Sequence, residues 1–570
     1  MTRRDTQIGS EITEEPRSGS HWIRVTILAL IPVLIVAAGG GYLLTRHTTP
    51  DHRQAEATAA LSAYLAAWTK GDYAGMAAHS DATATAIQAV DAPIKRSLVV
   101  SGVRYAPGVL TRDQTGDRGS APYSARLTLT GLGVWSYSGS LGVVKSKDAA
   151  GKDVWRVHFG PTAIVPQLTA GRSIVRTHVS ATRGRLLDID GIPLRGADGD
   201  LDSNLLGTVG PLTVAEAKAA GPPFAAGDSA GQTGIERAYN AQLTGRPGGA
   251  VLLTQGAVRI STLADFPATP GRDVTTTISL HVQRAGESAL AAIGPPAAIV
   301  AIDTRTGGGS ALVNHPAGGF GRAVRGGYPP GSTFKVVTTT AALLAGKTET
   351  TPLNCPPTVL IAGRPFKNSM NESFGLIDLR KAFAVSCNTA FVNLRESMTE
   401  ADMKRAALLY GFDGSPPLPI QSFGGSYPVP SGPVDVAASA FGQGAVEASP
   451  LQMASVAAAV ASGEWRKPFV AGRTSAIHPI PTAVDAALKD MMRAVLTDPQ
   501  GTAAGVAFPG LVYGKTGTAE YGSGTNLPTH AWCIGFRGTV AFCVFVEGGG
   551  FGAAVAAPIA SNFLSLLGPG

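Results

Sequence analysis

Residues 327–335 read Gly-Tyr-Pro-Pro-Gly-Ser-Thr-Phe-Lys and stand directly before a helical stretch at 336–345. Because Pro and Gly end whatever element precedes them, the pattern predicts that Ser332 lies in the first turn of this helix. Ser332 and Lys335 are three positions apart and therefore share a helix face. No other lysine in the chain has a serine three positions before it. The alternative for this short stretch alone is a capping serine followed by an exposed lysine.

The chemistry that this pair predicts is nucleophilic catalysis, since a serine hydroxyl is a poor nucleophile until a base removes its proton. A lysine amine can be that base when burial and a second cation lower its pKa from about 10.4 toward 7. The candidate for the second cation is Lys515. The expected nucleophile is thus Ser332, with Lys335 as its base.

A second motif, Ser386-Cys387-Asn388, lies within an apolar helical region at 382–391. A serine here can relay a proton to a leaving amine, and an asparagine amide can hold a peptide carbonyl of the substrate. Residues 369–371 repeat the Ser-x-Asn spacing, but they lie in a polar stretch and are interpreted as a loop. The apolar segments around Ser386 would hold it rigidly, so it is the predicted member of the site.

The third motif is Lys515-Thr516-Gly517-Thr518. On a strand edge, Lys515 and Thr516 could bind a substrate carboxylate, and Gly517 would let the backbone of a ligand lie against the strand. The backbone amides of Ser332 and Thr518 would then form an oxyanion hole, in which one donor is worth about 3 kcal/mol in the transition state.

Two further motifs suggest other chemistry. Residues 510–516 (GLVYGKT) look like a phosphate-binding loop, but they have one intervening residue too few and no helix is expected after them. Residues 227–231 (GDSAG) match a hydrolase nucleophile pattern, yet no strand leads into them and they are interpreted as a loop. Neither motif changes the prediction of a serine–lysine site.

The rest of the chain after residue 50 predicts several domains. Residues 297–303 form a buried strand, and the helices, β-branched strands and final helix at 557–567 that follow predict an α/β sandwich with an antiparallel sheet. Upstream, a helical region from about 53 to 80, with an end near Lys70, precedes alternating strands and predicts a small α+β domain. Residues 188–191 predict a strand that ends in a tight turn.

Composition excludes several classes. The chain has 570 residues, which suggests about three to four domains. The excess of 47 Lys and Arg over 40 Asp and Glu is modest and no dense basic tract is present, which argues against nucleic-acid binding. The four cysteines have no zinc-ligand spacing. If residues 537–539 turn a hairpin, Cys533 and Cys543 fall opposite each other. The sequence leaves open whether they form a disulfide or remain two buried thiols.

One segment predicts a membrane span. Residues 25–44 contain no charge, and at about 1.5 Å per residue they would cover about 30 Å, the thickness of a bilayer core. Arginines precede this segment, which favours a cytoplasmic N-terminus and an exported remainder. A cleaved signal peptide is the alternative, but the length of the segment favours an uncleaved anchor.

Taken together, the three motifs resemble the serine signature of β-lactamases and penicillin-binding proteins, and the chain resembles a class B penicillin-binding protein. Residues 68–73 and 155–166 resemble the NTF2-like N-terminal domain of some members. Residues 183–191 and 234–240 resemble the family's dimerisation or pedestal domain, and residues 270–274 its junction with the transpeptidase domain.

This resemblance implies a multidomain α/β (α+β) chain. Its expected parts are a cytoplasmic tail at 1–24, a transmembrane helix at 25–44, an NTF2-like domain at 51–166, a dimerisation or pedestal domain at 170–290 and a transpeptidase domain at 296–568. The last is expected to contain an antiparallel five-stranded sheet with helices on both faces, together with an all-α subdomain.

The resemblance also implies a function. Ser332 would attack the D-Ala-D-Ala bond of a peptidoglycan stem peptide, release D-alanine and pass the acyl group to an amine on a neighbouring strand. Lys335 would activate Ser332, and Ser386 would protonate the leaving group. The implied substrate-binding residues are Asn388, Lys515, Thr516, Gly517 and Thr518. β-Lactams should acylate Ser332, no metal or cofactor is implied, and glycan polymerisation would need a separate partner, such as a membrane polymerase.

Two other functions remain open from the sequence. A D,D-carboxypeptidase or β-lactamase could use the same serine, although no Glu-x-x-x-Asn pattern follows Ser386 where a deacylating base would be expected. A non-catalytic β-lactam sensor is a candidate of another class, but about 24 residues before the apolar segment are too few for a signalling unit. The sequence does not distinguish a role in elongation, division or sporulation.

Overall fold

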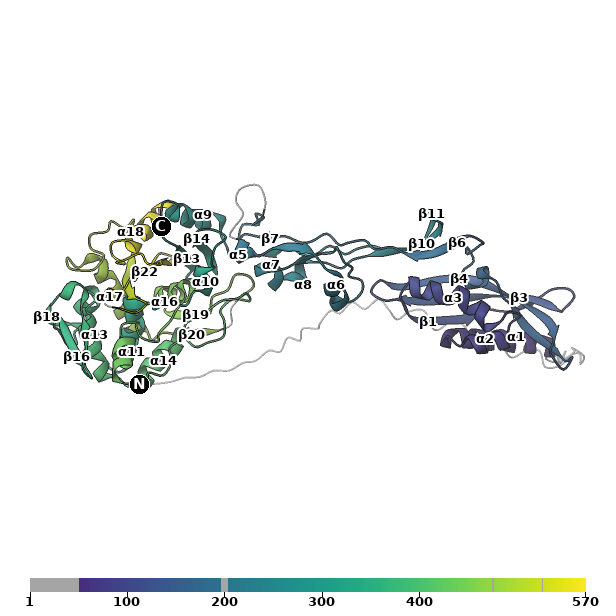
Figure 1. The fold of residues 1–570 in the computed structure, drawn as a ribbon, viewed down its shortest axis with the longest axis horizontal. Helices are drawn as coiled ribbons and strands as arrows, with labels where there is room; N and C mark the ends of the chain where they lie inside the picture. The colour runs from purple at the N-terminus through teal and green to yellow at the C-terminus, as the bar shows by residue number, and fades with distance from the viewer. Residues whose placement is uncertain (1–50, 196–202, 474–475, 525, 570) are drawn as a thin grey trace, which may run out of the picture.

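The fold is described from a computed structural model, which describes residues 51–195, 203–473, 476–524 and 526–569. Three folded parts follow one another along the longest axis, with the C-terminal domain at one end and the N-terminal domain at the other (Figure 1). The expected membrane span at 25–44 lies outside the described residues. In the part of the chain that is described, no helix has the length and apolar character needed to cross a bilayer.

The N-terminal domain consists of three helices followed by one curved sheet and a short fourth helix. Asp51 caps the first helix by accepting from the amides of Arg53 and Gln54, and Gly71 ends this helix at a φ of 71°. The sheet order is β1-β3-β4-β5, with β2 beside β3, and all pairs are antiparallel. The bounds are α1 (His52–Lys70), α2 (Tyr73–Ala78), α3 (Ala84–Ser97), β1 (Val100–Pro107), β2 (Thr111–Arg112), β3 (Arg118–Leu129), β4 (Gly133–Lys147), β5 (Asp153–His158) and α4 (Pro161–Ile164). The predicted α+β domain and the helix end near Lys70 are confirmed.

The middle domain contributes to the cores of both its neighbours. Ile174, Val251 and Leu253 of its β11-β10-β6 sheet are buried in the core of the N-terminal domain. At its other end, Leu186 and Ile235 belong to the main core of the C-terminal domain. Its elements are β6 (Arg172–Arg176), β7 (Leu186–Leu187), α5 (Ser203–Leu206), β8 (Val209–Pro211), α6 (Val214–Ala220), β9 (Ser229–Gly231), α7 (Gly234–Ala238), α8 (Asn240–Leu243), β10 (Gly249–Gln255), β11 (Val258–Phe266) and β12 (Val274–Thr275).

Two local predictions fall in this domain. The tight turn after β7 is confirmed, because Gly191 donates to the carbonyl of Asp188 at 3.2 Å and has a φ of 85°. The GDSAG stretch was expected to be a loop, but residues 229–231 form strand β9, which pairs with β8. The buried Asp228 accepts hydrogen bonds from His178 and Ser180, and these contacts fix the start of this strand.

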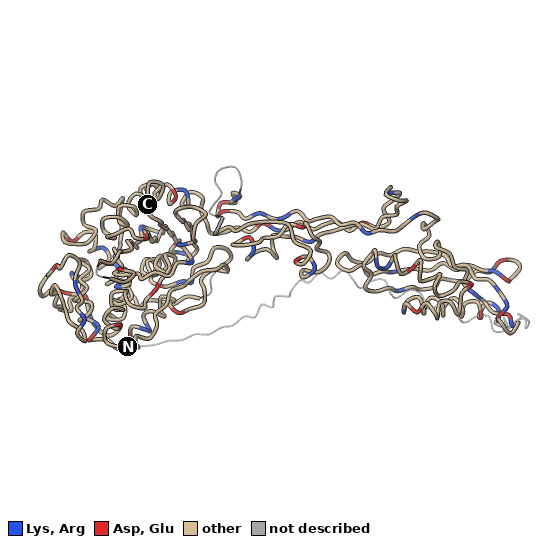
Figure 2. The backbone as a smooth tube through the Cα atoms, viewed as in Figure 1, with Lys and Arg blue, Asp and Glu red and all other residues tan. Residues whose placement is uncertain are grey.

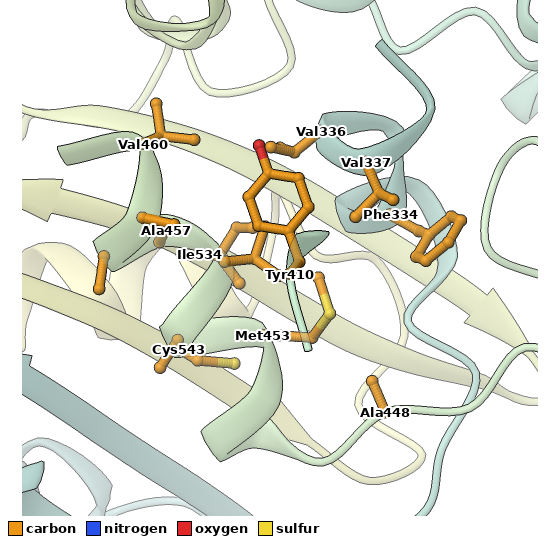
Figure 3. Packing of buried hydrophobic residues seen from close by; sticks show 14 of the residues in the cluster. Phe334, Val336, Val337, Tyr410, Ala448, Met453, Ala457, Val460, Ile534 and Cys543 are labelled. Atoms are coloured by element: carbon orange, nitrogen blue, oxygen red, sulfur yellow. The ribbon is translucent and has the colours of Figure 1, made fainter. Parts of the chain in front are cut away.

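The C-terminal domain is built on a five-stranded antiparallel sheet in the order β14-β13-β23-β22-β21. Residues of α9 and α18 form one core against this sheet, and α11 and α16 belong to the core on the other face. Figure 3 shows the second core, with Tyr410 and Met453 packed beside Ile534 of β22. The bounds of these elements are α9 (Leu280–Leu290), β13 (Ala297–Asp303), β14 (Gly309–His315), α11 (Lys335–Leu344), α16 (Pro450–Ser462), β21 (Tyr513–Glu520), β22 (Thr529–Arg537), β23 (Val540–Val546) and α18 (Ala556–Leu566).

The expected all-α subdomain is wrong in one respect, because it also contains two antiparallel β-ribbons, β15–β18 and β16–β17. The remaining elements of the domain are α10 (Arg322–Arg325), η1 (Gly331–Phe334), β15 (Pro352–Cys355), β16 (Thr358–Ile361), β17 (Arg364–Lys367), η2 (Ser369–Asn371), β18 (Gly375–Asp378), α12 (Leu379–Ala384), α13 (Asn388–Leu394), η3 (Arg395–Ser397), α14 (Glu400–Leu409), α15 (Pro433–Ser439), β19 (Glu464–Arg466), β20 (Ile477–Pro479) and α17 (Thr482–Thr497).

The hairpin of β22 and β23 decides the question of Cys533 and Cys543. Its register pairs Cys533 with Val544 and Cys543 with Ile534, so the turn is one residue shorter than 537–539. Side chains alternate along a strand, and the two cysteines therefore lie on opposite faces of the sheet. Both are buried and free.

Charged residues of both signs are interspersed along all three domains (Figure 2). This pattern agrees with the small net excess of basic residues in the sequence. It gives no support to a nucleic-acid surface on the described residues.

Candidate active site

Ser332 lies in the 3-10 turn η1, immediately before α11, rather than inside the helix as the sequence predicted. The tighter turn arises where Gly331 takes a φ of 52° and donates to the carbonyl of Gly442 at 2.9 Å. A Cβ on Gly331 would lie 2.5 Å from the carbonyl oxygen of Thr518, so only glycine lets the turn approach β21 this closely. The local sequence thus places the serine against the edge strand.

Lys335 is fully buried and links the first two motifs. Its Nζ lies 3.0 Å from Ser332 Oγ, 2.7 Å from the carbonyl oxygen of Ser386, 3.2 Å from Ser386 Oγ and 2.7 Å from Asn388 Oδ1. These contacts join η1 to the loop between α12 and α13. The structure therefore brings Ser332, Lys335, Ser386 and Asn388 together, as their motifs predicted.

The electrostatics of the site favour a neutral Lys335. Burial is the largest cause that lowers its pKa well below the ordinary lysine value, and the neighbouring Lys515 lowers it further. Lys515 is also fully buried, and burial lowers its own pKa to about 7. Two buried ammonium groups close together repel each other and lose their hydration. Both effects favour the neutral amine, so these two lysines release protons at a lower pH than exposed lysines do.

The Ser386 loop has a strained backbone. Ser386 takes a φ of 58°, which is uncommon for a residue other than glycine, and its amide donates to the carbonyl of Phe383 at 3.2 Å. Cys387 follows, and α13 begins at Asn388. Residues 369–371, which repeat the spacing, form the exposed turn η2, so the choice of Ser386 agrees with the geometry.

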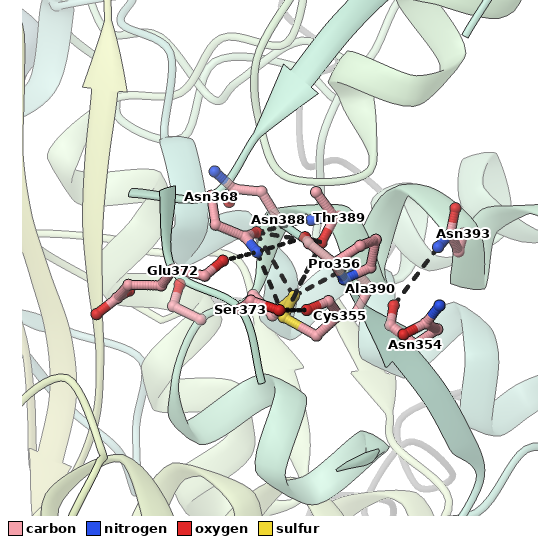
Figure 4. The surroundings of a disulfide bond; sticks show 12 residues. Asn354, Cys355, Pro356, Asn368, Glu372, Ser373, Asn388, Thr389, Ala390 and Asn393 are labelled. Atoms are coloured by element: carbon pink, nitrogen blue, oxygen red, sulfur yellow. Dashed lines mark hydrogen bonds between the residues drawn. A yellow bond between two sulfur atoms is a disulfide. The ribbon is translucent and has the colours of Figure 1, made fainter. Parts of the chain in front are cut away.

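A disulfide bond between Cys355 and Cys387 holds this loop to β15. The sequence reasoning did not predict it, and the only signal was a cysteine at the centre of the Ser-x-Asn motif. Asn368 supports the bridge from the side, since its Nδ2 donates to the carbonyls of Pro356 and Glu372 and its Oδ1 accepts from the amide of Thr389 (Figure 4). The middle residue of a catalytic motif is thus covalently tied to a neighbouring strand.

Replacing both bridged cysteines by serine should lower stability and loosen Ser386 and Asn388. The bridge spans a sequence separation of 32, for which chain entropy gives about 3–4 kcal/mol. Thermal unfolding should show a lower Tm for C355S/C387S, and penicillin acylation should be slower. Reductant should lower the Tm of the parent and leave that of the double variant unchanged. Equal Tm values for parent and variant would contradict a stabilising bridge.

The Lys515 motif lies on β21, an edge strand of the sheet. A Cβ on Gly517 would lie 2.8 Å from Thr333 Cγ2 and 3.1 Å from the Thr333 amide nitrogen. The missing side chain of Gly517 therefore makes room for the η1 turn, and its expected role of letting the backbone of a ligand lie against the strand stays a prediction. On the other face of the strand, Thr516 Oγ1 lies 2.6 Å from Thr502 Oγ1, and Thr518 Oγ1 accepts from the amide of Gly552 at 3.1 Å.

The apparent phosphate-binding loop at 510–516 runs into β21, and no helix follows it, so its rejection is confirmed. A cavity of about 690 Å³ lies elsewhere, between the middle domain and α10, where Arg237 and Arg325 border it. The residues of the three motifs do not border this cavity. The site is identified by hydrogen bonds and burial rather than by cavity size.

Comparison with known proteins covers most of the chain. Residues 297–565 match the penicillin binding protein transpeptidase domain, residues 195–276 the penicillin-binding protein dimerisation domain, and residues 56–172 the NTF2-like N-terminal transpeptidase domain. The chain is 34% identical over 402 residues to the peptidoglycan D,D-transpeptidase PbpA of Mycolicibacterium smegmatis, an alignment that covers 57% of this chain and 78% of that protein.

Solved structures agree with this similarity. Penicillin-binding protein A from M. tuberculosis, as a penicillin G acyl-enzyme complex, has a TM-score of 0.54 at 27% identity, covering 68% of this chain and 99% of that one. PBP2 of Pseudomonas aeruginosa, in complex with WCK 5153, has a TM-score of 0.59 at 25% identity, covering 69% and 96% of the two chains. With the three motifs assembled around Lys335, the chain belongs to the class B penicillin-binding proteins, a family of serine-type peptidoglycan D,D-transpeptidases.

Proposed function

We propose that Ser332 is the nucleophile and Lys335 the base of a D,D-transpeptidase that acts on peptidoglycan stem peptides. The single observation that supports this most is the set of contacts around Lys335 Nζ. The carbonyl oxygen of Ser386 and Asn388 Oδ1 can only accept hydrogen bonds, so they take both N–H groups of a neutral amine. The lone pair of that amine then faces the hydroxyl of Ser332, whose proton it accepts.

In the first half-reaction, Ser332 Oγ bonds to the carbonyl carbon of the penultimate D-alanine while its proton moves to Lys335. The amides of Ser332 and Thr518 donate to the oxyanion that forms. When the C–N bond breaks, the proton passes from Lys335 through the hydroxyl of Ser386, 3.2 Å away, to the amine of the departing D-alanine. The product is an acyl ester on Ser332.

In the second half-reaction, an amine of a neighbouring stem peptide attacks this ester. Its proton returns through the same Ser386 and Lys335 route, and the ester C–O bond breaks to restore the Ser332 hydroxyl. Asn388 would hold a peptide carbonyl of the donor, and Lys515, Thr516 and Thr518 would hold its terminal carboxylate. Gly517 contributes by letting η1 lie against β21.

β-Lactams are expected to acylate the same serine, because they present a strained amide and a carboxylate to the same groups. The relative from M. tuberculosis forms a penicillin G acyl-enzyme, which supports this assignment. Glycan polymerisation would require a separate partner, for which a membrane polymerase is the candidate.

The apolar segment at 25–44 and the arginines before it support a single membrane anchor with a cytoplasmic N-terminus and an extracytoplasmic catalytic domain. Cell fractionation should recover the full chain with membranes, and removal of residues 1–44 should release it. Recovery of the full chain in the soluble fraction would contradict the anchor.

Transpeptidation is distinguished from hydrolysis by its products. With uncross-linked glycan strands and the purified protein, mass spectrometry should show cross-linked peptide dimers together with released D-alanine. Benzylpenicillin should block both. Shortened peptides without dimers would indicate a carboxypeptidase. Steady turnover of benzylpenicillin would indicate a β-lactamase. Stable acylation without any peptide product would indicate a sensor.

A further inference from the structure

Thr502 lies outside the three motifs but touches one of them. It follows α17, and its Oγ1 lies 2.6 Å from Oγ1 of Thr516, fourteen positions later in the sequence. Thr502 is half-buried, and Thr516 is 5% exposed. A contact this short between two hydroxyls is a well-formed hydrogen bond, so one of them donates and the other accepts.

The backbone holds the Thr502 hydroxyl in place from two sides. Its amide donates to the carbonyl of Ala384, the last residue of α12, at 3.1 Å. The preceding Gly501 donates to the carbonyl of Asp498 at 2.7 Å, and a Cβ there would lie 2.4 Å from the carbonyl oxygen of Val495. Thr502 therefore links the helix that leads to Ser386 with the strand that bears Lys515.

The direction of the hydrogen bond follows from proton counting. Each threonine hydroxyl has a single proton, and if Thr516 uses its own for a substrate carboxylate, its oxygen is left to accept from Thr502. Thr518, two residues along the same face of β21, has the same arrangement, because its oxygen accepts from the amide of Gly552. With Thr502 as the donor, Thr516 would match Thr518, and each hydroxyl would have a protein donor at its oxygen and a proton available for a ligand.

We propose that Thr502 is a positioning residue that donates to Thr516 and thereby directs the Thr516 proton toward the terminal carboxylate of the substrate. This inference rests on the proposed function, in which Thr516 binds that carboxylate. Thr502 itself does not touch the reacting atoms. Its effect is selectivity for ligands that bear a negative charge at this point.

The test compares two ligands on two variants of the full chain. T502V keeps the shape of the side chain but removes the hydroxyl, and T502S keeps the hydroxyl. The second-order acylation constant for benzylpenicillin should fall about tenfold in T502V, because Thr516 loses the donor that directs its proton toward the charged carboxylate. For benzylpenicillin methyl ester, which lacks the charge, the constant should stay within about twofold of the parent. T502S should react with both ligands like the parent.

Equal losses for the two ligands in T502V would show a merely structural role and overturn the proposal, as would an unchanged constant for benzylpenicillin. A double-mutant cycle adds a second check: in a T516V background, T502V should cause no further loss, because the group that it orients is gone. An additive loss would contradict the proposal. Failure of the parent itself to be acylated at Ser332 would instead contradict the proposed function.

Discussion

Replacing Ser332 by alanine should abolish covalent labelling by a fluorescent penicillin. The other serine hydroxyl near the amine, Ser386 Oγ at 3.2 Å from Lys335 Nζ, is assigned to proton relay in the proposed mechanism and is not expected to replace Ser332 as the nucleophile. The readout is in-gel fluorescence of purified parent and variant, with intact-mass spectrometry to detect the adduct. Cross-linked products should disappear in the same variant.

Ser369→Ala is the matched control, since Ser369 belongs to the second Ser-x-Asn sequence but lies in an exposed turn. It should be labelled like the parent. Both variants should keep the parental Tm, because neither side chain fills the core. Label that persists on Ser332→Ala would exclude this serine as the nucleophile.

Replacing Lys335 by alanine should slow acylation by about 10²- to 10⁴-fold, the usual contribution of a general base. The amine is the one basic group within hydrogen-bonding distance of Ser332 Oγ among the described residues. Lys335→Met serves as a second variant, because methionine fills the buried space that alanine would leave empty. Stopped-flow or quench measurements of the acylation constant would show the loss. Near-parental acylation by Lys335→Met would remove the base role.

The pH profile gives an independent check with a defined sign. Protonated Lys335 cannot accept the Ser332 proton, so the acylation constant should fall as the pH drops through its depressed pKa. Burial lowers the pKa of Lys515 to about 7, and above this pH the charge that would attract the ligand carboxylate in the proposed mechanism is lost, so the acylation constant should fall again at higher pH. Lys515→Met should remove this descending limb. A profile that rises continuously to the ordinary lysine pKa would contradict the low pKa of Lys335.

The three motifs could be recognised from the sequence because each depends on neighbours in the chain. The three-residue spacing of Ser332 and Lys335 lies within one helical turn, and the alternation in β3 and the apolar run of β13 are properties of consecutive residues. The glycine and proline residues at 327–331 likewise indicated a turn at Ser332. Local geometry of this kind was enough to predict an α/β sandwich with an antiparallel sheet, whereas the five strands with helices on both faces were implied by the family resemblance.

Other features depended on register and long-range packing. The β22–β23 turn is one residue shorter than expected, and Cys533 and Cys543 therefore lie on opposite faces of the sheet. Because side chains alternate along a strand, a shift of one residue in the register moves a side chain to the other face. The Cys355–Cys387 bridge, the reason for Gly517 and the contact of Thr502 with Thr516 each join segments that only folding brings together. Sequence spacing contains no information about such distances, because a short interatomic contact depends on how whole elements pack against one another.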